Sequence, residues 1–162
     1  MAVVGGHVAP RPVVSLRRAV LTVRVLTLCA AQLRDSNIIA LGSSMRVRVP
    51  SQRELLSPAV VIVRRWPEFW GQSHDVVTNP HAIFEVASVA TDERERRRKL
   101  AALAQLPSLE HYVLIMDDSV SVEHHLRGDG HGWHVTRHHR RDNLCIESLD
   151  VELAVDAIYS WR

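Results

Sequence analysis

The spacing of hydrophobic residues changes along the chain, and each spacing predicts a different kind of element. Over residues 13–34 the apolar positions recur three or four residues apart, which predicts a long amphipathic helix. Residues 45–50 alternate strictly between apolar and charged side chains and end in proline, which is typical of a half-buried strand. The continuous apolar runs 59–63 and 81–87 predict strands that are covered on both faces.

The second half of the chain returns to a helical spacing and then to alternation. Thr91 is a suitable N-cap, and the acidic residues that follow it favour the positive end of a helix running to about residue 105. Residues 111–116 predict a further buried strand, and 120–126 and 133–138 predict two strands joined by a glycine-rich turn. Residues 144–162 predict a short strand or turn, with a helical turn near 155–159.

These elements predict an α/β fold in which a mixed β-sheet carries a helix on each side and ends in a C-terminal β-meander. The length of 162 residues fits a single domain. Within it we expect two parts, an irregular segment and helix over residues 1–43 and the main core over residues 44–162.

The composition is that of an ordinary soluble globular protein, with 46% hydrophobic and 23% charged residues and a formal net charge of +2. A sequence pI of about 8.8 permits an acidic partner such as nucleic acid without requiring one. Cys29 and Cys145 are far apart and show no metal-binding spacing. Arginines interrupt the apolar segment 13–33, and no signal peptide is recognisable, so we expect a cytoplasmic protein without a membrane span.

Glu85 is an acidic residue within an apolar strand, and it is followed by Lys99, the only lysine of the chain. Burial of a carboxylate is costly unless the carboxylate is paired, hydrogen-bonded or bound to a metal. Strand alternation puts Glu85 on the same face as Ile83 and Ala87. The simplest structural roles are an ion pair of Glu85 with an arginine and of Lys99 with Glu95, one helical turn away.

The motifs around these two residues resemble the core of the bacterial Uma-two family of restriction-endonuclease-like proteins. The resemblance rests on the segments MRVRVP (45–50), TNPHAIFEVAS (78–88), LPSLEHYVL (106–114) and VELAVDAIY (151–159), and on the spacing from Glu85 to Lys99. It covers roughly residues 44–159. The family is similar to the PD-(D/E)XK nucleases, so the resemblance implies a restriction-endonuclease-like fold.

The resemblance also implies an activity, namely Mg²⁺-dependent hydrolysis of phosphodiester bonds in DNA. Glu85 would be a catalytic residue and a metal ligand, because Mg²⁺ prefers hard oxygen donors. Lys99 would be the catalytic lysine that orients the attacking water and stabilises charge on the phosphate. DNA is then the expected partner, and a homodimer is a further expectation at the level of the superfamily.

The chain departs from the family pattern at Ala59, which stands where the family has the aspartate of its Pro-Asp motif. A methyl group binds no metal, so one of the two expected carboxylates is missing. The alternative prediction is therefore a catalytically dead remnant that binds nucleic acid or a protein partner. Glu54, Glu68 or Asp75 could supply a replacement ligand, and the spacing does not choose among them.

Two further groups of residues allow more than one interpretation. The arginine-rich run 94–98 is typical of a solvated helix face and can also contact phosphates. Several histidines near the predicted hairpin raise the possibility of a zinc site: His124, His125, His131, His134, His138 and His139. They alternate along strands without cysteine partners, which favours exposed strand histidines over a metal site.

Overall fold

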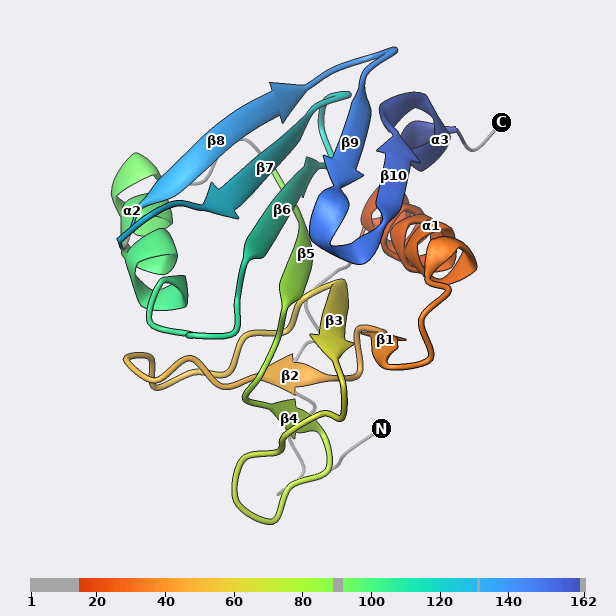
Figure 1. Ribbon diagram of the computed structural model, residues 1–162. Helices are drawn as coiled ribbons and strands as arrows, with labels where there is room; N and C mark the ends of the chain where they lie inside the picture. The colour runs from red at the N-terminus through yellow and green to blue at the C-terminus, as the bar shows by residue number, and fades with distance from the viewer. Residues whose placement is uncertain (1–14, 89–91, 131, 161–162) are drawn as a thin grey trace, which may run out of the picture.

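A six-stranded mixed β-sheet forms the centre of the protein, with α1 and α2 on opposite sides of it (Figure 1). This computed structural model describes residues 15–88, 92–130 and 132–160. In hydrogen-bonded order the strands are β1 (Ile38–Leu41), β3 (Val60–Arg64), β5 (Ala82–Ala87), β6 (His111–Met116), β7 (Val122–Arg127) and β8 (Trp133–His138). Only β5 and β6 pair in parallel within this sheet.

Two short strand pairs lie beside the main sheet. The strands β2 (Arg46–Val47) and β4 (Val76–Val77) pair in parallel. The strands β9 (Asn143–Ile146) and β10 (Val151–Ala154) pair antiparallel and are joined by the 3₁₀ turn η1 (Glu147–Leu149). The last element, α3 (Val155–Tyr159), follows β10 directly.

The central strands β3, β5 and β6 are buried on both faces, in agreement with their apolar runs, whereas the edge strand β8 is mostly exposed. The helix α1 (Leu16–Gln32) packs on one face together with β9 and β10, and this α1-side core includes Leu21, Val60 and Phe84. The helix α2 (Glu93–Leu103) packs on the other face, where the α2-side core includes Leu103 and Ile83. Burial of these side chains is the main stabilising term.

The ends of the two long helices are capped by polar side chains. Ser15 is the N-cap of α1, and its hydroxyl accepts a hydrogen bond from the Arg18 amide at 3.1 Å. Asp92 is the N-cap of α2 and accepts from the Arg94 amide at 3.2 Å. The predicted cap Thr91 lies outside the described residues.

The connection from β5 through α2 to β6 positions the region of interest. Because β5 and β6 are parallel, the chain must cross over one face of the sheet between them. The helix α2 forms this crossover and packs on the face that carries Ile83. Glu85 is on β5, the strand that leads into α2, and lies next to Leu114 of β6 in the parallel register.

The predicted fold class is confirmed, whereas several strand predictions were wrong in detail. The strand predicted at 45–50 spans only Arg46–Val47, because its partner β4 supplies just two paired residues, and Val47 also forms an isolated bridge with Leu56. The four-residue edge strand β1 was not predicted. No helix within the described residues is long and apolar enough to cross a membrane.

Candidate active site

Glu85 is held by the crossover between β5 and α2. Its side chain is on the α2 side of the sheet, and the residue is only 8% exposed. The Nζ atom of Lys99, on α2, makes an ion pair with the Oε2 atom of Glu85. The structure thus pairs Glu85 with the lysine rather than with an arginine.

Tyr112 is the second partner of the same carboxylate oxygen. Its hydroxyl donates a hydrogen bond to Oε2 of Glu85 at 2.8 Å, and Lys99 Nζ lies 5.9 Å from the centre of its ring. Burial, together with the neighbouring Glu85 carboxylate, raises the pKa of Tyr112 well above its usual value of 10.0. The tyrosine therefore remains a neutral phenol that can donate this bond.

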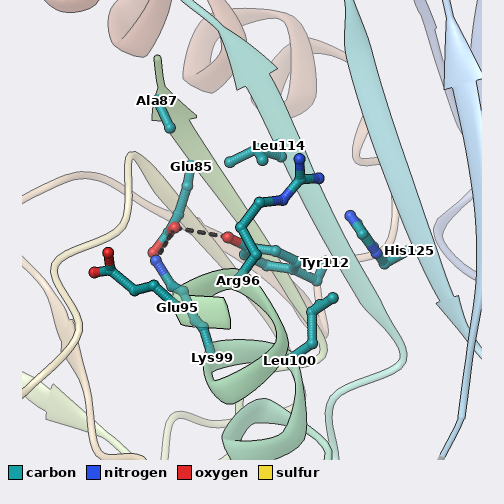
Figure 2. A pocket seen from close by; sticks show the side chains of 9 residues that line it. All are labelled: Glu85, Ala87, Glu95, Arg96, Lys99, Leu100, Tyr112, Leu114 and His125. Atoms are coloured by element: carbon teal, nitrogen blue, oxygen red, sulfur yellow. Dashed lines mark hydrogen bonds and ion pairs between the residues drawn. The ribbon is translucent and has the colours of Figure 1, made fainter. Parts of the chain in front are cut away.

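The pair lies in a cavity of about 180 Å³ between α2 and the sheet. The cavity is lined by Glu85, Ala87, Glu95, Arg96, Lys99, Leu100, Tyr112, Leu114 and His125. In Figure 2 the carboxylate of Glu95 points toward the same end of the cavity as Glu85 and the Lys99 amine. Glu85 and the Lys99 amine are therefore in direct contact, whereas Glu95 lines the same cavity but is exposed to solvent.

A second ion-pair cluster lies beside the cavity and shares Arg96 and His125 with its lining. Glu123, on β7, is 4% exposed and makes ion pairs with Arg96 and, at 3.1 Å, with Nε of Arg137. Nε2 of His125 lies 3.4 Å from Oε2 of Glu123. Burial lowers the pKa of His125 below 6.5, although Glu123 acts in the opposite direction.

The structure does not bring Ala59 into this cavity. The amide of Ala59 donates to the Phe84 carbonyl at 2.9 Å, so its backbone lies next to Glu85. The residue is 6% exposed, however, and its methyl group packs within the α1-side core. Within the described chain, Glu85 and Lys99 converge, whereas the side chain at position 59 faces a different group of residues.

None of the three carboxylates considered as a replacement for the missing aspartate lines the described cavity. Asp75 makes an ion pair with Arg46 at 2.5 Å, and Glu54 and Glu68 are exposed elsewhere. Glu95 is the carboxylate that lines it instead. Glu95 and Lys99 are four residues apart and therefore lie on one face of α2.

The arginines of α2 mostly face solvent. Arg94, Arg97 and Arg98 are exposed, and Arg97 pairs with Glu93 at 3.2 Å. Arg96 is the exception, since it is half-buried against Glu123. The helix therefore presents a basic outer face beside the cavity.

The histidines do not all have the exposed positions expected from the sequence. His134 and His139 are exposed and His138 is half-buried, but His124 and His125 are buried within β7, because that strand is covered on both sides. His131 lies outside the described residues. His81 and His111, which the sequence did not single out, are also buried.

The chemistry of the cavity fits a divalent cation such as Mg²⁺. Mg²⁺ is commonly bound through one or two carboxylates and keeps several waters. Glu85 and Glu95 supply two carboxylates in one cavity, and about 180 Å³ has room for several water molecules. Glu85 and Glu95 are therefore the residues that could hold such an ion.

Comparison with known proteins identifies the fold class first. A crystal structure described as a "putative nuclease belonging to DUF820", from Anabaena variabilis ATCC 29413, matches with a TM-score of 0.70 over 98% of this chain and 88% of that chain. At 12% identity this match shows the fold alone, which is that of the restriction-endonuclease-like nucleases.

The family follows from the sequence match. Residues 4–156 match the Uma2 family, described as "Putative restriction endonuclease", and the chain belongs to this family. Two relatives come from Synechocystis sp. (strain ATCC 27184 / PCC 6803 / Kazusa). The uncharacterized protein slr1290 is 25% identical over 145 residues, covering 90% of this chain and 75% of the relative. The uncharacterized protein sll1609 is 26% identical over 131 residues, covering 81% and 74%.

Proposed function

We propose that this protein is a divalent-metal-dependent endonuclease that hydrolyses phosphodiester bonds in DNA at the cavity between α2 and the sheet. The observation that carries the proposal is the contact between Lys99 and Glu85 inside a cavity that also contains Glu95. An amine beside two carboxylates is the combination that metal-assisted phosphodiester hydrolysis requires. Membership of the Uma2 family supports the same reaction class.

Each side chain then has a separate role. Glu85 and Glu95 would hold the cation, which would supply Lewis-acid chemistry at the phosphate and lower the pKa of a nearby water. Lys99 stabilises the negative charge that develops on the phosphate oxygens and orients the attacking water. Tyr112 fixes the orientation of Glu85 through its 2.8 Å hydrogen bond, which reduces the reorganisation needed during the reaction.

The basic outer face of α2 provides the means of binding DNA. Arg94 and Arg98 are exposed on the helix that carries Lys99. Arginines in this position attract backbone phosphates irrespective of base sequence, and such binding weakens as salt is raised. The helix would thereby bring a phosphodiester to the cavity.

A non-catalytic DNA-binding protein is the second candidate, and Ala59 is the observation that favours it. Its methyl group cannot bind a metal and packs within the α1-side core, so position 59 supplies no carboxylate to the cavity. In this alternative the ion pair of Lys99 and Glu85 is purely structural. The arginines of α2 would still bind DNA.

Incubation of supercoiled plasmid DNA with Mg²⁺ or Mn²⁺, with and without EDTA, distinguishes the two functions. The nuclease proposal predicts nicking by the natural chain that EDTA abolishes. Absence of nicking by the natural chain with either metal would show instead that the natural site is degenerate. DNA binding by a chain that never cuts would support the second candidate.

A further inference from the structure

A second cluster of polar side chains lies at the beginning of β5 and β6, away from the cavity. On β6, Val113 packs in the α1-side core and Tyr112 in the α2-side core. His111 is two residues from Val113, so strand alternation directs its side chain to the α1 side. The sheet therefore separates His111 from Glu85.

His81 and His111 are brought together by a serine from a distant part of the chain. The Ser148 hydroxyl, in η1, lies 2.9 Å from Nε2 of His81 and 2.8 Å from Nε2 of His111. Oε2 of Glu110 lies 3.6 Å from the first of these nitrogens and 3.7 Å from the second. The three potential ligand atoms of His81, Glu110 and His111 all lie within 4.8 Å of one another.

His124, on the neighbouring strand β7, orients the ring of His111. Nδ1 of His111 and Nε2 of His124 are 3.0 Å apart, and the two rings are stacked with their centres 5.2 Å apart. When Nδ1 of His111 carries the proton of this hydrogen bond, Nε2 of His111 has the free lone pair, which accepts from the Ser148 hydroxyl at 2.8 Å. Metal-binding histidines commonly use their second nitrogen in this way.

Both imidazoles are available as neutral ligands. Burial, reinforced by His124 and His81, lowers the pKa of His111 to about 3. Burial also lowers the pKa of His81, against the effect of Glu110. Neutral imidazole is the form that binds metals.

We propose that His81, Glu110 and His111 form a binding site for one Zn²⁺-like transition-metal ion, independent of the nuclease cavity. Two nitrogen donors and one carboxylate favour Zn²⁺ over Mg²⁺, which prefers oxygen. Two ligand atoms of a tetrahedral zinc ion are about 3.4 Å apart, given Zn–N and Zn–O distances near 2.1 Å. The separations of 3.6 and 3.7 Å are therefore close to binding geometry.

The exposure of the three side chains provides a path for the ion. The side chains of His81 and His111 are 6% and 4% exposed, whereas that of Glu110 is 47% exposed. The site thus opens to solvent through Glu110 and is otherwise enclosed by the sheet and η1. A metal bound there would stabilise the native state by mass action, since it links the starts of two central strands.

The site can be tested by Zn²⁺ titration of the tag-free protein after a chelator has removed bound metals. A chromophoric zinc chelator that competes with the protein reports the affinity and the stoichiometry of binding. We expect one Zn²⁺ per chain and a rise in the melting temperature. Glu110→Gln should weaken binding at least about tenfold, and His111→Gln should weaken it further. Co²⁺ should give visible absorption bands in the natural chain that both variants lose.

Matched variants separate this site from the rest of the molecule. Glu54→Gln and His134→Gln change exposed residues, and Glu85→Gln changes the opposite face, so all three should bind Zn²⁺ normally. Equal affinity of Glu110→Gln and the natural chain, or no stoichiometric binding by the natural chain, would overturn the proposal. Glu110 is half-exposed, so this variant decides the question even where His111→Gln fails to fold. Zn²⁺ binding is measured without DNA, so the outcome does not depend on whether the protein is an active nuclease.

Discussion

The amine of Lys99 is in contact with Oε2 of Glu85, although the two residues belong to different elements and are 14 positions apart. The contact exists because α2 forms the crossover between the parallel strands β5 and β6. Glu85 comes from the strand before the crossover and Lys99 from the helix itself. The arrangement therefore depends on the fold and not on a local turn.

Glu95→Gln tests whether the second carboxylate of the cavity replaces the aspartate that is missing at position 59. We expect at least a tenfold loss of DNA cleavage and a higher Mg²⁺ concentration for half-maximal rate, because one metal ligand loses its charge. The matched control is Glu93→Gln, an exposed carboxylate on the same helix. Equal Mg²⁺ dependence of both variants would remove Glu95 from the site.

Tyr112→Phe removes the hydrogen bond to Glu85 and keeps the ring. The free energy of unfolding should fall by about 1 kcal/mol, which is typical for one hydrogen bond. Cleavage should fall by about tenfold, since Glu85 is less well oriented. Urea unfolding and plasmid nicking measure the two effects separately. Unchanged activity in a destabilised variant would mean that the tyrosine is only structural.

Glu123→Gln should destabilise the protein more than any exposed carboxylate does. Glu123 is the shared partner of Arg96 and Arg137, and its removal leaves both guanidinium groups without that partner. The side chains of Arg96 and Arg137 are 24% and 65% exposed and stay accessible to water, so the loss should cost about 1–3 kcal/mol. Glu93→Gln breaks an exposed pair and should cost less than about 1 kcal/mol. Similar urea midpoints for these two variants would contradict the account.

His125→Phe should change how stability depends on pH. The pKa of His125 is lowered by burial, with Glu123 acting to raise it and Arg96 and Arg137 acting to lower it. Below about pH 6.5 the unfolded chain binds a proton at this residue before the native chain does. The native state therefore loses stability as pH falls through this range.

Phenylalanine cannot take up that proton. When the pH is lowered from 7.5 to 5.5, the free energy of unfolding of the variant should therefore rise relative to that of the natural chain. Urea unfolding at both pH values measures the difference. A constant difference between the two proteins would show that His125 does not titrate as described.

The main elements could be predicted from the sequence because their hydrophobic spacing is regular. Both long helices and the strands β3, β5, β6, β7 and β8 were expected close to their observed positions. The short strands β1 and β4 have too few residues for a periodic pattern. Their pairing depends on residues far away in the chain, which local spacing does not reveal.

The candidate site shows the same division. The position of Glu85 within an apolar strand and the single lysine on the next helix indicated the pair. Glu95 was considered only as a partner of Lys99, because nothing local showed that its carboxylate lines the same cavity. The contact of His81 with Ser148 spans 67 positions, so only the folded chain brings these residues together.

The most direct test of the central claim compares plasmid nicking by the natural chain and by Lys99→Ala, with Arg140→Ala as a control at an exposed arginine outside α2. Removal of one group that stabilises transition-state charge costs roughly 100-fold or more in rate. We predict metal-dependent nicking by the natural chain and by Arg140→Ala, and a loss of at least about 100-fold in Lys99→Ala. Equal nicking by the natural chain and Lys99→Ala would contradict the proposed active site.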